Sequence, residues 1–359
     1  MVDTKEGTLR QSVSPTRRGV VAGVAGTAIA APALLFPGKA RAAERLVVVN
    51  WGGGVAAAKK AAYYDPFTAE TGIPVVSVAG PELAKIKVQV QSKDVEWDLV
   101  DLVDSWVTAG EELGLYEKID TSIVPMDRLL PAARRDHEFA THFYAGVICH
   151  SETRMPEPRR PKTWADYWNV EKFPGRRGLR NRIGETLEIA LLADGVPPDQ
   201  VYPCDVERAF KALDRVKPHI TQWVAQTPQT SLLVQAGELD LSYTYLSRVY
   251  EGRKAGVPLG FSPENNLIGG QWMAAIKGTK NKAAAMRFME FFTRPDRQEA
   301  YCNITGHAPA VKGVLEKLKP EIRPWVPDPL GKTNLILNTD WWAGKEETLT
   351  KRFKEWLLT

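Results

Sequence analysis

The sequence predicts an α/β protein of two lobes, each built from an open, mostly parallel sheet with helices on both faces. Short β-branched runs alternate with helical segments, which is typical of parallel strands joined by helical crossovers. The length of 359 residues suits two hydrophobic cores, in lobes of about 150 residues each. A hydrophobic fraction of 44%, with 11 Trp, 10 Tyr and 11 Phe, excludes a disordered chain.

The N-terminal segment has the order of a secretory signal. A basic stretch that includes Arg17 and Arg18 precedes an apolar run at 19–36, and small residues precede a cleavage point after Ala42. The paired arginines are typical of twin-arginine export in bacteria. We therefore expect residues 1–42 to be a signal peptide and the mature chain to work in the periplasm. The alternative is a retained membrane anchor, although a run of 18 residues is marginal for a span.

The net charge of +4 lies entirely within this segment. Residues 1–42 contain six basic and two acidic side chains, and residues 43–359 contain 41 of each. A main part without basic excess is not expected to bind nucleic acid. Three cysteines are too few for a disulfide scaffold. One pair among Cys149, Cys204 and Cys302 could bridge after export, or all three could be buried thiols.

The elements of the first half alternate between strand and helix. Residues 46–49 form a continuous β-branched run that Asn50 ends, so we expect a buried parallel strand. The same patterns predict strands at 75–78 and 97–100, and helices at 55–67, 82–91 and 106–113. Ligands of such folds lie beyond the carboxyl ends of the strands. The loops at 50–54 and 101–106 are therefore candidate binding segments.

A proline-rich break at residues 155–163 precedes a second set of elements. Thr163 is a suitable N-cap for a short helix at 164–168. Further helices are predicted at 187–194, 206–216, 231–236, 281–292 and 346–358, and a strand at 239–245. The helix at 281–292 is amphipathic, since Phe288 and Phe292 fall on one side of it.

No catalytic signature stands out in the chain. There is no Gly-x-Ser-x-Gly nucleophile elbow, and His137 and His142 have no Cys or acidic residue at metal-ligand spacing beside them. The 52–54 glycine turn could present N–H groups to an anion, or it could be only a tight turn. We expect no metal, no cofactor and no enzyme activity. The alternatives are an exported enzyme using His307 or Glu185 as acid or base, and a structural or adhesion protein of the cell surface.

Aromatic residues gather near the ends of the predicted strands. They are Trp51, Trp106, Tyr243, Tyr245, Trp272, Trp341 and Trp342. Core packing would explain most of them, but Trp51 beside three glycines and the Trp341–Trp342 pair in a polar stretch favour a binding role. Aromatic walls attract amino or quaternary ammonium groups through cation–π contact.

Several motifs follow one another in an order that resembles a known family. They are Asn50–Trp51 after the first strand, Phe-Thr-Ala-Glu-Thr-Gly-Ile-Pro-Val at 67–75, Trp-Asp-Leu-Val at 97–100, Gly-Leu-Tyr-Glu-Lys-Ile-Asp at 114–120, Thr-Trp-Ala-Asp-Tyr-Trp at 163–168, Phe-Pro-Gly at 173–175, Arg-Pro-Asp-Arg-Gln-Glu-Ala at 294–300 and Gly-His-Ala-Pro at 306–309. This order resembles the periplasmic solute-binding proteins of bacterial ABC importers, and among them the spermidine/putrescine-binding kind.

The resemblance implies a type II-like periplasmic binding fold, with two lobes that close on a small solute about a hinge. Lobe 1 would comprise residues 43–147 and 268–315, and lobe 2 residues 148–267 and 316–359, with crossings near 145–150, 264–270 and 312–320. It also implies a monomer whose partners are a small-molecule solute and the permease and ATPase complex of an ABC importer in the inner membrane.

The resemblance marks individual pocket positions. Trp51 matches an aromatic residue of the cleft, Glu185 matches a carboxylate that holds an ammonium group, and Tyr245 stands where those proteins place a Trp. The candidate solute-binding residues are Trp51, Gly52, Gly53, Asp104, Ser105, Trp106, Arg182, Glu185, Tyr245, Gln271, His307 and Trp342.

Other pocket positions depart from the polyamine pattern. Arg182 falls where a second carboxylate is expected, Gln271 where an Asp is expected, and His307 replaces a Tyr. Ser105, Gly54 and Gly269 replace aromatic residues.

These departures favour a different charge on the solute. An arginine close to a polycation would be unfavourable, whereas Arg182 suits a carboxylate or a phosphate-like group. With Glu185, it suggests a solute with one amino end and one acidic end, such as an amino-acid derivative or an opine. The alternatives are a true spermidine/putrescine-binding protein, and Arg182 as an exposed residue of the basic run at 176–182.

Overall fold

The computed structural model describes residues 45–359. The predicted signal peptide and its cleavage point after Ala42 lie outside this part of the chain. Within residues 45–359, no helix combines the length and the apolar character needed to cross a lipid bilayer.

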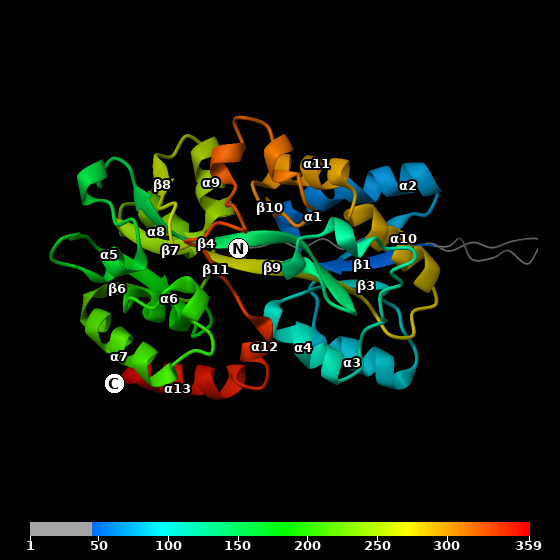
Figure 1. Ribbon diagram of the computed structural model, residues 1–359, viewed down its shortest axis with the longest axis horizontal. Helices are drawn as coiled ribbons and strands as arrows, with labels where there is room; N and C mark the ends of the chain where they lie inside the picture. Colours follow the sequence, from blue (N-terminus) through cyan, green and yellow to red (C-terminus); the bar gives the residue numbers. More distant parts are fainter. Residues whose placement is uncertain (1–44) are drawn as a thin grey trace, which may run out of the picture. The chain divides into compact units, whose positions relative to one another are not determined.

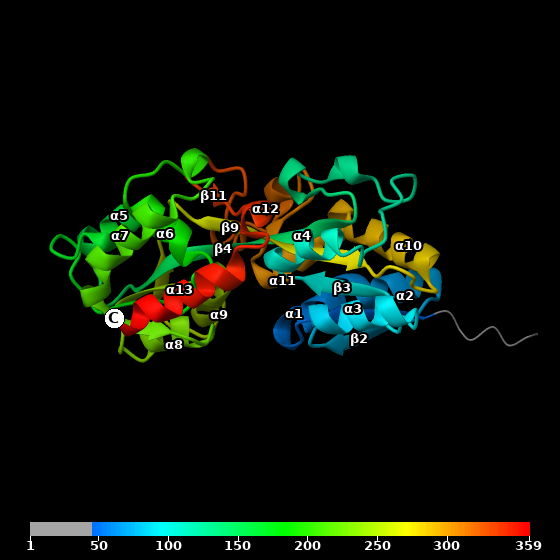
Figure 2. The same ribbon diagram turned by 90° about the horizontal axis from the view of Figure 1, so that it is seen from below.

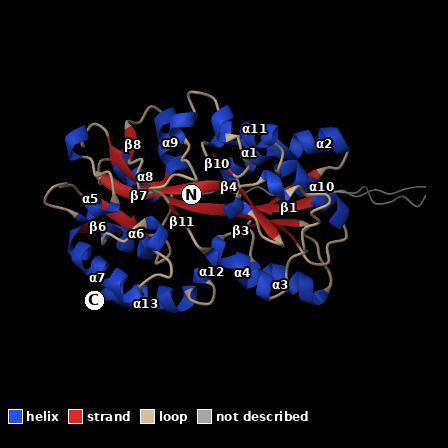
Figure 3. Ribbon diagram, in the orientation of Figure 1, coloured by secondary structure: helices blue, strands red, loops and turns tan. Residues whose placement is uncertain are grey.

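The described chain is organised around one β-sheet, with helices on both of its sides (Figures 1 and 3). The main strand order is β2-β1-β3-β9-β4-β7-β5-β6, and β8 and β10 pair with β4 while β11 pairs with β9. The strands are β1 (Leu46–Asn50), β2 (Val75–Ala79), β3 (Leu99–Leu102), β4 (Glu138–Ser151), β5 (Arg177–Arg180), β6 (Ile220–Val224), β7 (Leu241–Tyr245), β8 (Leu259–Phe261), β9 (Leu267–Ala275), β10 (Ala308–Pro309) and β11 (Leu335–Ile336).

The pairing is parallel at both ends of the sheet and antiparallel in its centre. Strand β1 runs parallel to β2 and β3, and β5 runs parallel to β6 and β7. The pairs β3–β9, β9–β4 and β4–β7 are antiparallel. The strand group at each end is therefore parallel, as expected for each lobe, and the sheet as a whole is mixed because two long strands, β4 and β9, pass through the centre and join the two groups.

The helices fall into three stretches of sequence. Before β4 lie α1 (Gly53–Lys59), a π-helical turn (Lys60–Tyr64), α2 (Asp65–Thr71), α3 (Leu83–Ser92), α4 (Asp104–Glu112) and 3-10 turns at Met126–Arg128 and Pro131–Ala133. Between β4 and β9 lie α5 (Trp164–Trp168), α6 (Thr186–Ala193), α7 (Val206–Val216), α8 (Gln229–Gln235), α9 (Leu246–Lys254) and 3-10 turns at Glu157–Arg159, Pro198–Gln200 and Lys217–His219. After β9 lie α10 (Lys282–Phe292), α11 (Pro295–Thr305), α12 (Thr339–Trp342), α13 (Glu346–Leu358) and 3-10 turns at Leu315–Lys317 and Arg323–Trp325.

Local sequence signals explain several helix ends. Gly72 ends α2 in the left-handed conformation, with a φ of 72°, which a residue without a Cβ adopts at little cost. Helix α5 begins after the predicted N-cap Thr163, which forms a capping box: the Thr163 hydroxyl accepts from the N–H of Asp166, and the Asp166 carboxylate accepts from the N–H of Thr163.

Two clusters of buried apolar side chains support the sheet. One lies around β1, β3, β4 and β9 and includes Tyr63 and Phe288, and it continues as far as Val249 of α9. The other includes Trp164, Leu213 and Phe353, contributed by α5, α7 and α13. Figures 1 and 2 show the corresponding groups of helices, α1, α2, α10 and α11 at one end of β4 and β9 and α5, α6, α7 and α13 at the other.

The cysteines do not form a disulfide. Cys149, Cys204 and Cys302 are all buried free thiols, so the alternative of one bridged pair is wrong. Burial raises the pKa of the Cys149 thiol to about 12, and this keeps it in the unreactive protonated form at neutral pH.

A candidate solute-binding cavity

A cavity of about 490 Å³ brings together most of the predicted site residues, and its size suits a small molecule. Nine of them line it: Trp51, Asp104, Ser105, Arg182, Glu185, Tyr245, Gln271, His307 and Trp342. Gly52, Gly53 and Trp106 are not part of the lining. Candidate binding residues from distant segments of the chain therefore line one cavity.

The glycine turn after β1 holds Trp51 at the cavity. Gly52 and Gly53 have φ values of 75° and 61°, a region that favours glycine, and the N–H of Gly52 donates to Asn50 Oδ1 at 2.9 Å. The two glycines thus build a tight turn. Trp51 projects from this turn with 39% of its surface exposed, and its indole Nε1 donates to Gln271 Oε1 at 3.1 Å.

The side-chain amide of Gln271 is fixed from both ends. Its Nε2 donates to the carbonyl oxygen of Leu102 at 3.0 Å, while its Oε1 accepts from Trp51. Trp106 lies behind Trp51, with ring centroids 5.9 Å apart. Trp106 therefore supports the aromatic wall without lining the cavity.

Asp104 supplies a carboxylate at the first turn of α4. Its Oδ2 accepts from the Tyr144 hydroxyl and its Oδ1 from the Trp272 indole, both at 2.8 Å. Burial raises the pKa of Asp104 to about 6, against the lowering effect of these two hydrogen bonds. Glu185 and Arg182 also influence this pKa, in opposite directions, so the three charged groups share one electrostatic environment.

Arg182 and Glu185 form an ion pair in the cavity wall. Arg182 Nη2 lies 2.6 Å from Glu185 Oε2 and 3.1 Å from the Tyr245 hydroxyl. Glu185 also accepts from the Tyr243 hydroxyl at 2.7 Å. Arg182 keeps 45% of its side chain exposed, as the alternative of an exposed residue in the 176–182 basic run expected, but it also lines the cavity and is paired there.

The backbone at Glu185 is strained. Its φ of 68° lies in the left-handed region, which costs energy for a residue with a side chain and occurs most often at functional sites. This conformation directs the buried carboxylate toward Arg182, Tyr243 and Tyr245. Three protein donors therefore already occupy Glu185.

Two histidine rings stack at another part of the cavity. The centroids of His142 and His307 are 4.4 Å apart, and the Tyr301 hydroxyl lies 3.4 Å from His142 Nε2 and 3.3 Å from His307 Nδ1. Burial lowers the pKa of both imidazoles, that of His307 to about 4. The pair is therefore neutral at pH 7 and adds no positive charge to the cavity.

Several lining residues were not predicted from the sequence. They include His142, Tyr144, Thr227, Ser247, Arg248 and Asn338. His142 and Tyr144 are two apart on β4, so they lie on the same face of that strand. Recognising β4 as a strand would have found this pair, and with Tyr144 the partner of Asp104.

The fold and the cavity together define a binding protein for small solutes, and comparison with known proteins gives the family. The chain belongs to the bacterial extracellular solute-binding proteins, whose family model matches residues 62–328. It is the solute-binding component of an ABC transporter, with the fold of the periplasmic binding proteins.

Two curated relatives are similar over most of the chain. The gamma-aminobutyric acid-binding protein of Pseudomonas aeruginosa is 34% identical over 90% of this chain and 94% of its own length. The spermidine/putrescine-binding periplasmic protein of Escherichia coli is 23% identical over 72% of this chain and 76% of its own length.

Two solved structures share the fold. A structure described as that of a GABA receptor superimposes on this chain with a TM-score of 0.80. The two sequences are 31% identical, and the match covers 88% of this chain and 98% of that chain. The binding protein AgtB of Agrobacterium tumefaciens, in complex with agropinic acid, has a TM-score of 0.73 and 27% identity, with 88% and 99% covered.

Proposed function

We propose that this protein captures a small zwitterionic amino acid of the γ-aminobutyric acid class and delivers it unchanged to the permease of an ABC importer. The observation that carries the proposal is the presence of opposite charges in one cavity, where the Arg182 guanidinium and the Asp104 carboxylate both form part of the wall. The two GABA-binding relatives, one curated and one solved, support the same class of solute.

Arg182 is the group we assign to the carboxylate end. A guanidinium has five N–H donors, and Glu185 and Tyr245 engage only the Nη2 nitrogen of Arg182. The remaining donors can form the bidentate contact that carboxylates favour. Glu185, which the resemblance assigned to an ammonium group, instead orients this guanidinium.

Asp104 is the group we assign to the ammonium end. Its two oxygens accept from Tyr144 and Trp272, and each oxygen retains further acceptor capacity. The indoles of Trp51 and Trp342 line the same cavity and can flank a cationic group through cation–π contact.

A polyamine is the weaker candidate. Two arginines, Arg182 and Arg248, line the cavity beside the acidic Asp104, Glu185 and Glu346. A polyamine has no carboxylate, so it would leave the free N–H donors of Arg182 without an acceptor. Gln271 cannot act as the counter-ion that an Asp at that position would provide.

In the proposed function, the protein is exported and its two lobes close on the solute. The lobes would be residues 43–147 with 268–315 and residues 148–267 with 316–359, and the cavity lining draws on both sets. Closure of the lobes would bury the solute and present the closed monomer to the permease. The predicted twin-arginine signal at 1–42 would place this activity in the periplasm.

Isothermal titration calorimetry with γ-aminobutyric acid, glutamate, putrescine and spermidine tests the solute class. We expect γ-aminobutyric acid to bind most tightly and spermidine weakly or not at all. In Arg182→Met the affinity should fall at least about thirtyfold, because the solute carboxylate loses a charged hydrogen-bonding partner.

Arg208→Met is the matched control for this substitution. Arg208 is an ion-paired arginine outside the cavity, with the same 45% side-chain exposure as Arg182, and its loss should leave the affinity unchanged. Tight spermidine binding, or full affinity in Arg182→Met, would overturn the proposed solute class. Conversion of the solute, followed by NMR over hours, would instead indicate an enzyme.

A further inference from the structure

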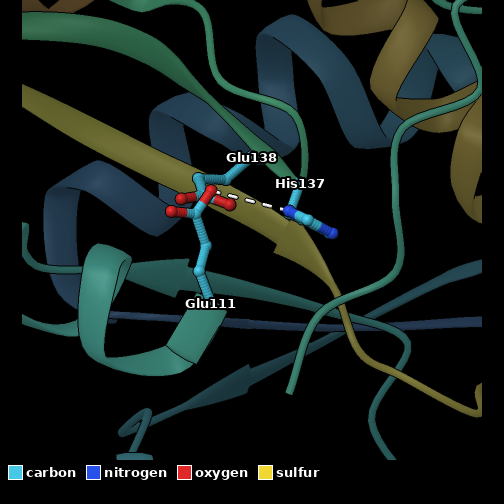
Figure 4. A group of neighbouring side chains, drawn as sticks. All are labelled: Glu111, His137 and Glu138. Atoms are coloured by element: carbon cyan, nitrogen blue, oxygen red, sulfur yellow. Dashed lines mark ion pairs between the residues drawn. The ribbon is translucent and has the colours of Figure 1, made fainter. Parts of the chain in front are cut away.

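A second group of potential ligands lies outside the solute cavity. Glu111 at the end of α4, and His137 and Glu138 at the start of β4, each direct one N or O atom into a common space, and these atoms lie within 4.8 Å of one another. Figure 4 shows the two carboxylates converging beside the imidazole of His137. None of the three side chains lines the solute cavity. The sequence alone did not indicate this group, because Glu138 directly follows His137 without a recognised ligand spacing and Glu111 of α4 reaches the imidazole only through folding.

Two of these atoms are buried without a hydrogen bond. Glu138 is fully buried, and its Oε2 has no hydrogen-bond partner within residues 45–359. His137 Nδ1 is also buried without a hydrogen bond from the described residues, and it lies 3.6 Å from Glu111 Oε1. Unpaired buried polar atoms are costly. Their convergence therefore indicates a ligand between them.

Arg135 engages the same two carboxylates. Its Nη2 lies 2.5 Å from Glu111 Oε2, its Nε lies 3.1 Å from Glu138 Oε1 and 3.4 Å from Glu111 Oε1, and its Nη1 lies 2.9 Å from Asp340 Oδ1. Hydrogen bonds to ligating carboxylates are typical around protein metal sites. When all three carboxylates are ionised, one guanidinium leaves an excess of two negative charges.

We propose that Glu111, His137 and Glu138 bind a divalent transition-metal cation, with Arg135 orienting the two carboxylates. The excess of two negative charges matches the charge of the ion. One imidazole nitrogen with two carboxylate oxygens suits Zn²⁺ or Mn²⁺. It suits Ca²⁺ and Mg²⁺ poorly, because these ions prefer all-oxygen coordination.

The ionised form of the buried Glu138 carboxylate is electrostatically unfavourable without a cation. Burial, followed by the proximity of Glu111, raises the pKa of Glu138 to about 9, against the lowering effect of Arg135. Tyr116 faces the same carboxylates, and its pKa is raised too, so its phenol stays neutral. A cation between Glu111 and Glu138 would offset this unfavourable charge, because a carboxylate coordinates in its ionised form.

The test is native mass spectrometry and calorimetry of the tag-free protein with ZnCl₂, MnCl₂ and CaCl₂. We expect one Zn²⁺ or Mn²⁺ per chain and no retained Ca²⁺. Glu138→Gln and His137→Asn should each weaken Zn²⁺ binding at least about tenfold.

His219→Asn and Glu207→Gln are the matched controls, because both residues are exposed and lie outside the cluster. Zn²⁺ binding that persists in Glu138→Gln and His137→Asn, or that disappears in His219→Asn, would overturn the proposal. His137→Asn keeps the test valid if the substitution of the buried Glu138 prevents folding. The metal titration needs no solute, so its outcome is independent of the proposed solute class.

Discussion

At the scale of single residues, the cavity depends on how a few side chains adjust the charge of their neighbours. Asp104 is held by Tyr144 and Trp272, yet burial still raises its pKa to about 6. The pKa of a free aspartate in an unfolded chain is near 3.8. Asp104 therefore changes charge within a pH range in which the folded protein can be studied.

This pKa predicts how solute affinity depends on pH. An ammonium group binds the ionised form of Asp104, which dominates above pH 6. Between pH 6 and pH 5 the affinity for γ-aminobutyric acid should fall by up to about tenfold, since one proton must be displaced. Calorimetry at pH 5, 6, 7 and 8 measures this dependence.

Asp104→Asn is the control, and its weaker binding should vary little over the same range. An affinity of the wild-type protein that stays constant from pH 8 to pH 5 would assign the ammonium group to another residue. In the solute-free protein, the contribution of Asp104 to stability should decrease as pH rises from about 4 to about 6, because the folded state binds the extra proton in that window.

At the scale of elements, strands β4 and β9 place the side chains that surround these charges. Tyr144 of β4 is paired with Gly269 of β9 in the antiparallel register, and a Cβ atom added at Gly269 would overlap the Tyr144 ring. A Cβ atom at Gly146 would likewise overlap the Tyr243 ring, whose hydroxyl binds Glu185. Gly269 stands where the polyamine-binding proteins of the resemblance have an aromatic residue. A side chain does not fit there, because the Tyr144 ring occupies the space.

This register predicts a selective effect of Gly269→Ala. The new methyl group must displace the Tyr144 ring, and an overpacked site of this kind costs about 1–3 kcal/mol. The displaced hydroxyl can no longer orient Asp104, so we expect weaker binding of γ-aminobutyric acid, measured by calorimetry, together with a lower midpoint of urea unfolding.

Gly54→Ala provides the comparison, because Gly54 is exposed and a Cβ atom there meets no neighbour. Tyr144→Phe separates the two effects, since it removes the hydroxyl and adds no bulk. Normal affinity in both Gly269→Ala and Tyr144→Phe would exclude a positioning role for Tyr144.

At the scale of the whole molecule, the C-terminal segment links helix α4 to helix α6. Asp340 of α12 accepts from Thr108 of α4 at 2.6 Å, while Trp342 donates its indole N–H to Glu188 of α6 at 2.6 Å. Trp342 also lines the cavity. Movement of the proposed lobes therefore involves α12, which is bonded to helices of both.

Closure of the lobes predicts a change in distance between α3 and α7. Spin labels on Lys87→Cys and Lys211→Cys, both exposed positions, should give a shorter and narrower distance distribution after addition of γ-aminobutyric acid. The three native thiols are buried, and burial raises their pKa, so they should not compete for the label.

The same labelled pair in Arg182→Met should keep the solute-free distances at a solute concentration that saturates the wild-type cavity. An unchanged distance in the saturated wild-type protein would mean that the solute binds without closure.

The sequence determined the elements whose signals are local. The helices predicted at 206–216 and 346–358 coincide with α7 and α13, and Thr163 caps α5 as expected. The strand predicted at 97–100 lies two residues later, at 99–102, because its boundaries depend on pairing with β1 and β9. The order of the motifs was sufficient to identify the family, and nine of the candidate binding residues named from the sequence line the cavity.

Only the tertiary structure decided the rest. Strand β4 is buried along nearly its whole length while carrying Thr141, His142 and His150, so it lacks the alternation of apolar and polar residues by which strands are recognised. The partners of Asp104 stand 40 and 168 residues away in sequence, and Glu111 meets His137 across 26 residues. Such contacts follow from strand register and sheet order, which no local pattern of residues specifies.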